Sequence, residues 1–171
     1  LDRRIMEADA NSLSYREFLS MLLIDELDMR TSRRINRLLR RASLGSEMTL
    51  ESFDFNFNAS INTKLIKNLA SCRFMERSEG IFFLGPTGTG KTHLAKALAH
   101  QACRLMFSVE FFSFHQLFAE LATADLQNRL STIMKRLLKV DLLVIDDFGF
   151  KAIDQAAAER FYALVDGRFR S

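Results

Sequence analysis

Residues 81–92, IFFLGPTGTGKT, place a short apolar run directly before a glycine-rich loop that ends in Lys91 and Thr92. The run 81–84 is predicted to form a strand buried on both faces, and an amphipathic helix is predicted over 91–105. The loop has the spacing GxxxxGK[ST], in which glycines let successive backbone N–H groups converge on phosphate oxygens beside a helix N-terminus. The alternative is a glycine-rich turn without a ligand, which would explain the glycines but not the Lys and Thr that follow them. The predicted phosphate site comprises Gly85, Pro86, Thr87, Gly88, Thr89, Gly90, Lys91, Thr92 and His93.

Within this site we expect Lys91 to bind the β and γ phosphates and the Thr92 hydroxyl to ligate Mg²⁺. His93, in the first turn of the helix, is expected to pack beside the site and not to transfer protons.

In a second motif, LLVIDD at 142–147, two aspartates follow directly after an apolar run. Ligands of parallel sheets bind at the carboxyl ends of the strands. Asp146 is therefore predicted to hold Mg²⁺, and Asp147 to polarise the water that attacks the γ-phosphate. An Asp pair after a strand can also be a turn or a helix N-cap, but the loop at Gly85 favours the functional interpretation. The predicted catalytic residues are Lys91 and Asp147, and the metal ligands are Thr92 and Asp146.

The chain alternates strand and helix patterns after residue 60, which predicts an α/β fold with a parallel sheet wrapped by helices. The predicted elements are helices over 61–69, 91–105, 115–122, 126–139 and 154–169, and strands over 81–84, 109–112 and 142–145. Residues 1–45 are predicted to be a helical N-terminal segment that binds DNA or a partner. Residues 46–60 are predicted to be an extended linker, and 61–171 the nucleotide-binding domain.

The N-terminal segment is predicted to hold two helices. Ser14 and Glu17 fit a capping box, and apolar residues then recur at helical spacing to Leu27. The second helix, over 31–43, places arginines on one face. No acidic residue lies between positions 29 and 46, so no internal ion pair is expected to neutralise them. We expect this face to bind DNA phosphates, although a solvated or paired face is the alternative; its residues are Arg30, Arg33, Arg34, Arg37 and Arg41.

Composition excludes several classes of protein. The 171 residues are 48% apolar with 16 Phe and a single Pro, so a disordered or collagen-like chain is excluded. The net charge of +3 suits an acidic partner. No apolar run is long enough to span a membrane, and Cys72 and Cys103 lack metal-site spacing, which predicts a cytoplasmic protein. A second basic face is a weaker candidate for DNA contact; it comprises Arg129, Arg136 and Lys139.

Three stretches together resemble the IstB/DnaC-like group of AAA+ ATPases, closest to the IstB-type transposition helper. They are LGPTGTGKTHLAKAL at 84–98, DLLVIDDFG at 141–149 and TLESFDF at 49–55. The resemblance implies a three-layer αβα fold, ATP with Mg²⁺, a homo-oligomer, and DNA and a transposase as partners. A replicative helicase loader, with a helicase as its client, is the alternative within the group.

Two features depart from the family's pattern. Asp147 stands where many AAA+ proteins have Glu, so turnover is expected to be slow. The chain stops at Ser171, before the family's sensor strand and arginine finger, and we expect a truncated segment that does not hydrolyse ATP alone. The absent strand would lie between 81–84 and 142–145. A nonenzymatic DNA-binding or partner-binding module is the third alternative. The linker phenyl rings are expected to pack on a neighbour or to line an adenine pocket; they are Phe53, Phe55 and Phe57.

Overall fold

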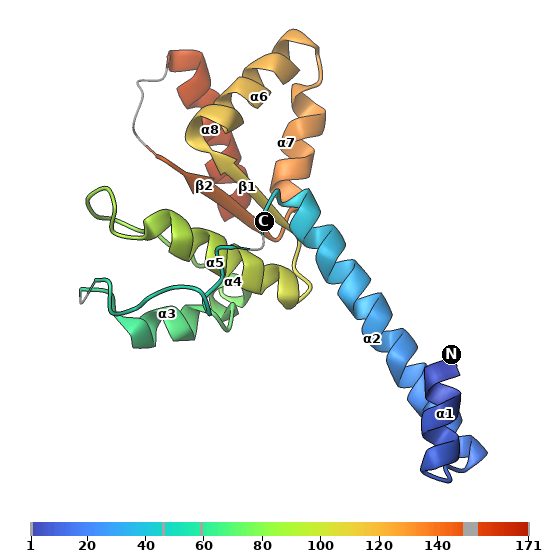
Figure 1. Cartoon of the computed structure of the whole chain (residues 1–171). Coiled ribbons are helices and arrows are strands. Elements are labelled where there is room, and N and C mark those ends of the chain that lie inside the picture. The colour runs from blue at the N-terminus through green and yellow to red at the C-terminus, as the bar shows by residue number, and fades with distance from the viewer. Residues whose placement is uncertain (1, 46, 59, 149–153, 171) are drawn as a thin grey trace. The chain divides into compact units, whose positions relative to one another are not determined.

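The structure, a computed structural model, describes residues 2–45, 47–58, 60–148 and 154–170 (Figure 1). Contacts divide the chain into two compact units, Leu1–Arg37 and Leu38–Ser171. The helices are α1 (Asp2–Ala10), α2 (Tyr15–Arg41), α3 (Thr63–Leu69), α4 (Arg73–Glu76), α5 (Lys91–Arg104), α6 (Phe114–Leu126), α7 (Leu130–Lys139) and α8 (Gln155–Phe169). The strands are β1 (Val109–Ser113) and β2 (Leu142–Asp146).

The first unit contains α1 and most of α2. The predicted capping box is confirmed, since the Ser14 N–H donates to Glu17 Oε2 at 2.8 Å and the Glu17 N–H donates to Ser14 Oγ at 3.4 Å. The expectation of two helices between Tyr15 and Ser43 is wrong, because α2 is continuous over Tyr15–Arg41. No glycine or proline interrupts this stretch, so nothing in its local chemistry stops the helix. The guanidinium of Arg4 on α1 donates to both carboxylate oxygens of Asp25 on α2, at 2.6 and 2.5 Å.

The boundary between the units falls inside α2, and not in the expected linker at 46–60. The last turns of α2 and the residues after them pack into the core of the second unit, which explains this position. The residues concerned are Leu38, Leu39, Ala42 and Leu44.

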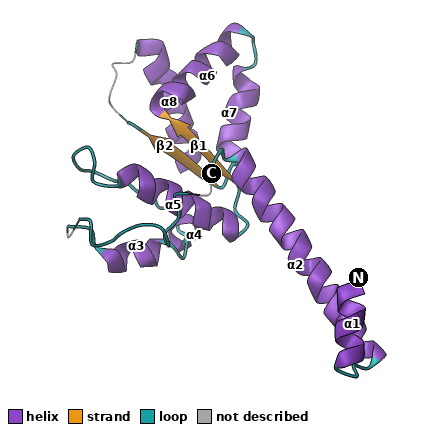
Figure 2. Cartoon of the chain, viewed as in Figure 1, coloured by secondary structure: helices purple, strands orange, loops and turns teal. Residues whose placement is uncertain are grey.

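The second unit is built on a parallel pair of strands, with Val109 opposite Leu142 and Ser113 opposite Asp146. Alternate strand residues face opposite sides. Phe111 and Val144 pack into a core that includes α5, whereas Phe112 and Ile145 pack with α6, α7 and α8. The strands therefore lie between two layers of helices (Figure 2). This arrangement confirms the predicted three-layer α/β fold.

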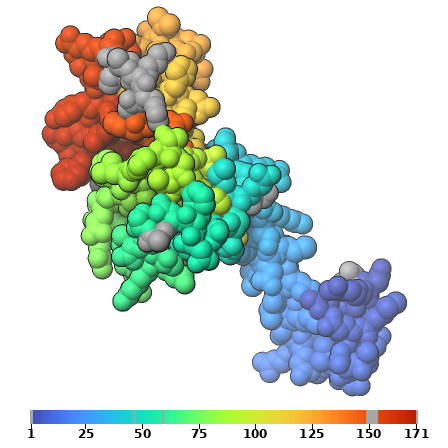
Figure 3. Space-filling view, turned by 60° about the vertical axis from the view of Figure 1, so that its left-hand side comes forward, coloured from blue at the N-terminus to red at the C-terminus, as the bar shows by residue number. Residues whose placement is uncertain are grey.

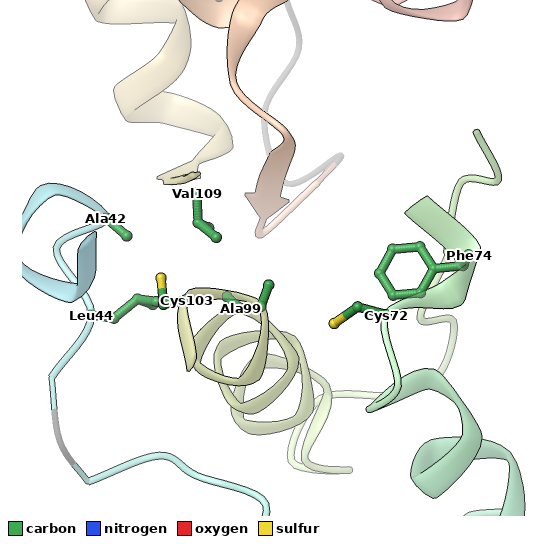
Figure 4. Packing of buried hydrophobic residues seen from close by; sticks show 8 residues of the cluster. Ala42, Leu44, Cys72, Phe74, Ala99, Cys103 and Val109 are labelled. Atoms are coloured by element: carbon green, nitrogen blue, oxygen red, sulfur yellow. The ribbon is translucent and has the colours of Figure 1, made fainter. Parts of the chain in front are cut away.

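The core on the α5 side contains both cysteines (Figure 4). Cys72 and Cys103 are free thiols, and both are buried. Burial raises the pKa of Cys103 to about 11 and also raises the pKa of Cys72. The small side chains of Ala99 and Ala102 let α5 approach the strands closely.

The expectation that 81–84 is a strand buried on both faces is wrong. Ile81 and Phe83 pack into the cores, but Phe82 and Leu84 are 87% and 90% exposed, and 81–84 is not part of the sheet. A strand needs a neighbour for its backbone groups. Among the described residues the sheet consists of β1 and β2, and 81–84 pairs with neither of them.

Most other predicted elements are confirmed, with shifts at their ends. α6 begins at Phe114 because Ser113 and Gln116 form a capping box. α7 begins at Leu130, later than predicted, because a turn with Asn128 at φ +54° separates it from α6. Within the ranges that the structure describes, none of the helices has the length and apolar character needed to cross a bilayer.

Candidate functional site

The glycine-rich loop curls directly into the N-terminus of α5. Gly88 and Gly90 have φ of +79° and +89°, in the left-handed region that other residues rarely adopt. Gly90 is the N-cap of α5, and its carbonyl accepts from the N–H of Leu94 at 2.9 Å. The Thr89 hydroxyl closes the turn by donating to Pro86 O at 2.9 Å. The N-terminal N–H groups of α5, which have no helical acceptors, therefore open toward the loop.

Lys91 places its charge over the same loop. It is the first residue of α5, and its Nζ donates to Gly85 O at 2.9 Å and Pro86 O at 2.6 Å. The ammonium and the helix N-terminus together make this loop an anion-binding environment.

Thr92 and Asp146 meet although 54 positions separate them in the chain. The Thr92 hydroxyl donates to Asp146 Oδ1 at 3.2 Å. Thr92 is in the first turn of α5, and Asp146 is the last residue of β2. The two sequence motifs thus form one site at the carboxyl end of the strands, as the sequence predicts.

The donors at this point suit magnesium. A hydroxyl and a carboxylate are both hard oxygen ligands, and Mg²⁺ takes one or two such protein ligands together with phosphate oxygens and water. Within the described part of the chain, no group of three or more His, Cys, Asp or Glu side chains is placed to hold a metal ion.

Asp147 follows β2 with an unusual backbone. Its φ is +56°, a left-handed conformation that Asp tolerates better than most residues. The next ring, Phe148, packs edge-on against Phe114 with centroids 4.8 Å apart and lies 5.6 Å from Phe161. Aromatic contacts to α6 and α8 therefore hold the backbone that carries Asp147.

The segment 47–53 also reaches the loop, where Phe53 packs against a neighbouring element, as one of the two alternatives for the linker phenyl rings predicts. Phe53 is buried, and its ring lies 2.8 Å from the position that a Cβ on Gly90 would occupy. His93 contacts Thr49, Ser52 and the ring of Phe53. Phe55 packs on Phe53, whereas Phe57 is 68% exposed. In the space-filling view, the teal and green atoms around residues 50–65 border the yellow-green atoms of residues 80–100 (Figure 3).

The arginine face of α2 is exposed, with one correction to the prediction. Arg30 is paired with Glu26, one turn earlier, at 2.7 Å, so the face is not wholly free of internal partners. Over residues 2–45 and the other described ranges, Arg33, Arg34 and Arg37 make no ion pair. On the weaker basic face, Arg136 of α7 pairs with Glu110 at 3.2 Å and with Glu120 at 2.7 Å.

The layered α/β fold, with the glycine-rich loop before α5 and Asp146 at the end of β2, is the fold of a P-loop protein of the AAA+ class. The fold is similar to that of the AMPPCP-bound DnaA of Aquifex aeolicus, with a TM-score of 0.66 and 22% identity over 74% of this chain and 40% of that chain. At this identity the likeness concerns the fold alone.

The family follows from the whole sequence: the chain belongs to the IstB-like ATP binding proteins, whose family model matches residues 1–171. It is 37% identical over 159 residues to a protein of Bacillus thuringiensis subsp. berliner described as an ATP-binding protein of insertion sequence IS232. It is 37% identical over 163 residues to one of Pseudomonas aeruginosa described in the same way for IS21. The matches cover 93% and 95% of this chain but 64% and 62% of those relatives.

Proposed function

We propose that this chain binds ATP with Mg²⁺ on the loop 85–92 and that the complete protein hydrolyses it. The observation that carries the proposal is the 3.2 Å contact between Thr92 Oγ1 and Asp146 Oδ1, which brings both predicted metal ligands together. A single ion shared by the two would lie beside the loop that takes the phosphates.

Each residue has a distinct role in this proposal. The N-terminus of α5 and the loop N–H groups bind the phosphates, and Lys91 exchanges its carbonyl partners Gly85 and Pro86 for β and γ phosphate oxygens. Thr92 and Asp146 would hold Mg²⁺, which neutralises phosphate charge. Asp147 orients the attacking water. Its side chain is shorter than Glu by one C–C bond, about 1.5 Å, so turnover is slow.

The site assignment is tested by replacing Lys91. Lys91→Ala should reduce the affinity for a fluorescent ATP analogue with Mg²⁺ at least about 100-fold, because a desolvated charge on the phosphates is lost. Lys64→Ala, on the exposed surface of α3, is the matched control and should bind as the parent does. Unchanged affinity of the Lys91 variant would refute the site.

We also propose that the protein is an ATP-dependent, DNA-binding helper of a transposase that acts as a homo-oligomer. Two observations support this proposal: the exposed arginines of α2, and relatives that are described as ATP-binding proteins of insertion sequences. Arginines that contact phosphates release counterions, so binding is salt-dependent and independent of base sequence.

The DNA proposal is tested by charge reversal. Replacing Arg33, Arg34 and Arg37 with Glu should weaken binding to random duplex DNA and reduce the slope of log K against log salt by about one per arginine. Reversal of Lys64 and Lys67 on α3 is the control. Equal affinity and slope in the arginine variant would contradict the proposal. Co-purification of a helicase in place of a transposase would favour the helicase-loader alternative.

A further inference from the structure

His93 joins the glycine-rich loop to residues 47–53, which belong to the same unit of the chain. Its Nε2 lies 3.0 Å from Thr49 O and 3.3 Å from Ser52 Oγ. A carbonyl oxygen only accepts, so Nε2 carries the proton and donates to Thr49. The donor belongs to the first turn of α5, directly after Lys91 and Thr92.

The acceptor side of this contact is fixed by its own hydrogen bonds. Ser52 Oγ donates to Glu47 O at 2.7 Å and accepts from the Thr49 N–H at 3.0 Å. Residues 47–52 therefore form a closed turn before His93 is counted. A donor bound to such a turn is held more firmly than one bound to a freely rotating side chain.

Phe53 continues the same turn into the loop. Its Cε2 and Cζ atoms lie 2.8 and 3.0 Å from the position of a Cβ on Gly90, and its ring meets the ring of His93 edge-on at 5.0 Å. It is buried together with Ile66 and Leu94. Phe53 is thus packed between the N-cap residue of α5 and the histidine one turn on.

A second contact fastens the same segment to the other end of α5. Arg104, in the last turn, donates to Glu51 at 2.5 Å. Hydrogen bonds from the Glu51 backbone and then from Arg104 lower the pKa of Glu51 to about 2, so this pair is ionised at neutral pH. The two contacts join the same pieces of chain, but only the one at His93 adjoins the phosphate-binding residues.

We propose that His93 is a positioning residue: its hydrogen bond to Thr49 holds the first turn of α5, with Lys91 and Thr92, in the geometry that binds ATP. This inference rests on the proposed nucleotide site. Without the hydrogen bond the turn at 47–52 is no longer fastened to the first turn of α5, and ATP must order this turn of the helix on binding.

The test separates the hydrogen bond from the ring packing. His93→Phe keeps a ring against Phe53 but has no donor, whereas His93→Gln places an amide N–H the same number of bonds from Cα as Nε2. The Phe variant should bind the fluorescent ATP analogue about 5- to 10-fold more weakly, the loss of one hydrogen bond, and the Gln variant should bind within about 2-fold of the parent. Arg104→Ala, which cuts the distant contact, should also remain within about 2-fold.

Thermal unfolding without nucleotide shows that each variant is folded. Parent-like binding by His93→Phe would overturn the inference, as would an equal loss in Arg104→Ala or no rescue by Gln. Lys91→Ala is run beside them. If it loses binding while His93→Phe does not, the positioning role is wrong and the site stands; if Lys91→Ala itself binds normally, the proposed site is wrong.

Discussion

Gly90 meets two demands at one residue. Its φ of +89° lies where a side chain is strained, and Phe53 occupies the place of a Cβ. The other loop glycines meet only part of this demand, since Gly88 has φ +79° with nothing within 4 Å of a Cβ. Backbone strain and side-chain clash can therefore be separated by substitution.

We expect Gly90→Ala to lower the free energy of unfolding by about 2–4 kcal/mol, from left-handed strain and overpacking together. Gly88→Ala should cost about 1–2 kcal/mol from strain alone. Gly80→Ala, in open space without a positive φ, should stay within about 0.5 kcal/mol. Urea denaturation measures all three. Equal losses at Gly90 and Gly88 would show that the contact with Phe53 does not constrain the loop.

Asp147 offers a second test at this scale, because Asn also tolerates its φ of +56°. If the complete protein hydrolyses ATP as proposed, Asp147→Asn should leave ATP affinity within about 3-fold and lower the hydrolysis rate about 100-fold or more, because the proposed water-orienting carboxylate is lost. Single-turnover hydrolysis of labelled ATP measures the rate. Full activity in the Asn variant would remove Asp147 from the mechanism.

At the scale of elements, Arg168 connects α8 to the end of α7. Its Nη1 donates to Leu137 O at 2.7 Å and Val140 O at 2.8 Å, and its Nη2 donates to Asp141 O at 3.2 Å. Leu137 lies in the last turn of α7, where a carbonyl has no N–H donor from within the helix, so Arg168 supplies one. The neighbouring Gly167 lets α8 lie against Leu138. Sequence periodicity identifies both helices but does not reveal this contact.

Arg168→Ala should therefore destabilise the protein by about 2–3 kcal/mol, because several hydrogen bonds from one partly buried charge are lost. Arg168→Lys should recover only part of the lost stability, since an ammonium lacks the planar set of N–H donors that a guanidinium presents. Arg170→Ala is the matched control. Arg170 is exposed, and among the described residues its ion pair is with Asp166 of α8, so the cost should be below about 0.5 kcal/mol. The free energies of unfolding of the three variants are measured by denaturant titration, in which the midpoint shifts and the m-value stays unchanged.

At the scale of the whole molecule, the two thiols report on unfolding of the second unit. Cys103 and Cys72 are 0% and 1% exposed, and burial raises the pKa of both, so the reactive thiolate is scarce at neutral pH. The chain must open before either reacts.

Labelling by a disulfide reagent should therefore be slow in buffer and fast in urea. Mg²⁺ with ATP at 100 times its Kd should slow labelling about 100-fold, because the ligand stabilises only the folded form. Lys91→Ala should lose this protection. Rapid labelling in buffer would show that the core around α5 opens without global unfolding.

Sequence alone determined the fold class and the order of most helices and strands, and it located the glycine-rich loop before α5. It could do so because helical and strand periodicity are local, and because GxxxxGK[ST] depends on backbone conformation within eight residues. The family resemblance rests on the same short stretches.

Tertiary structure decided what depends on neighbours distant in the chain. The run 81–84 has strand character but lies outside the sheet, because strand pairing needs a partner that local sequence does not supply. The meeting of Thr92 with Asp146 and of His93 with Thr49 required the fold to bring separate segments together. Periodicity records which face of a helix or strand is apolar, whereas packing decides what that face touches.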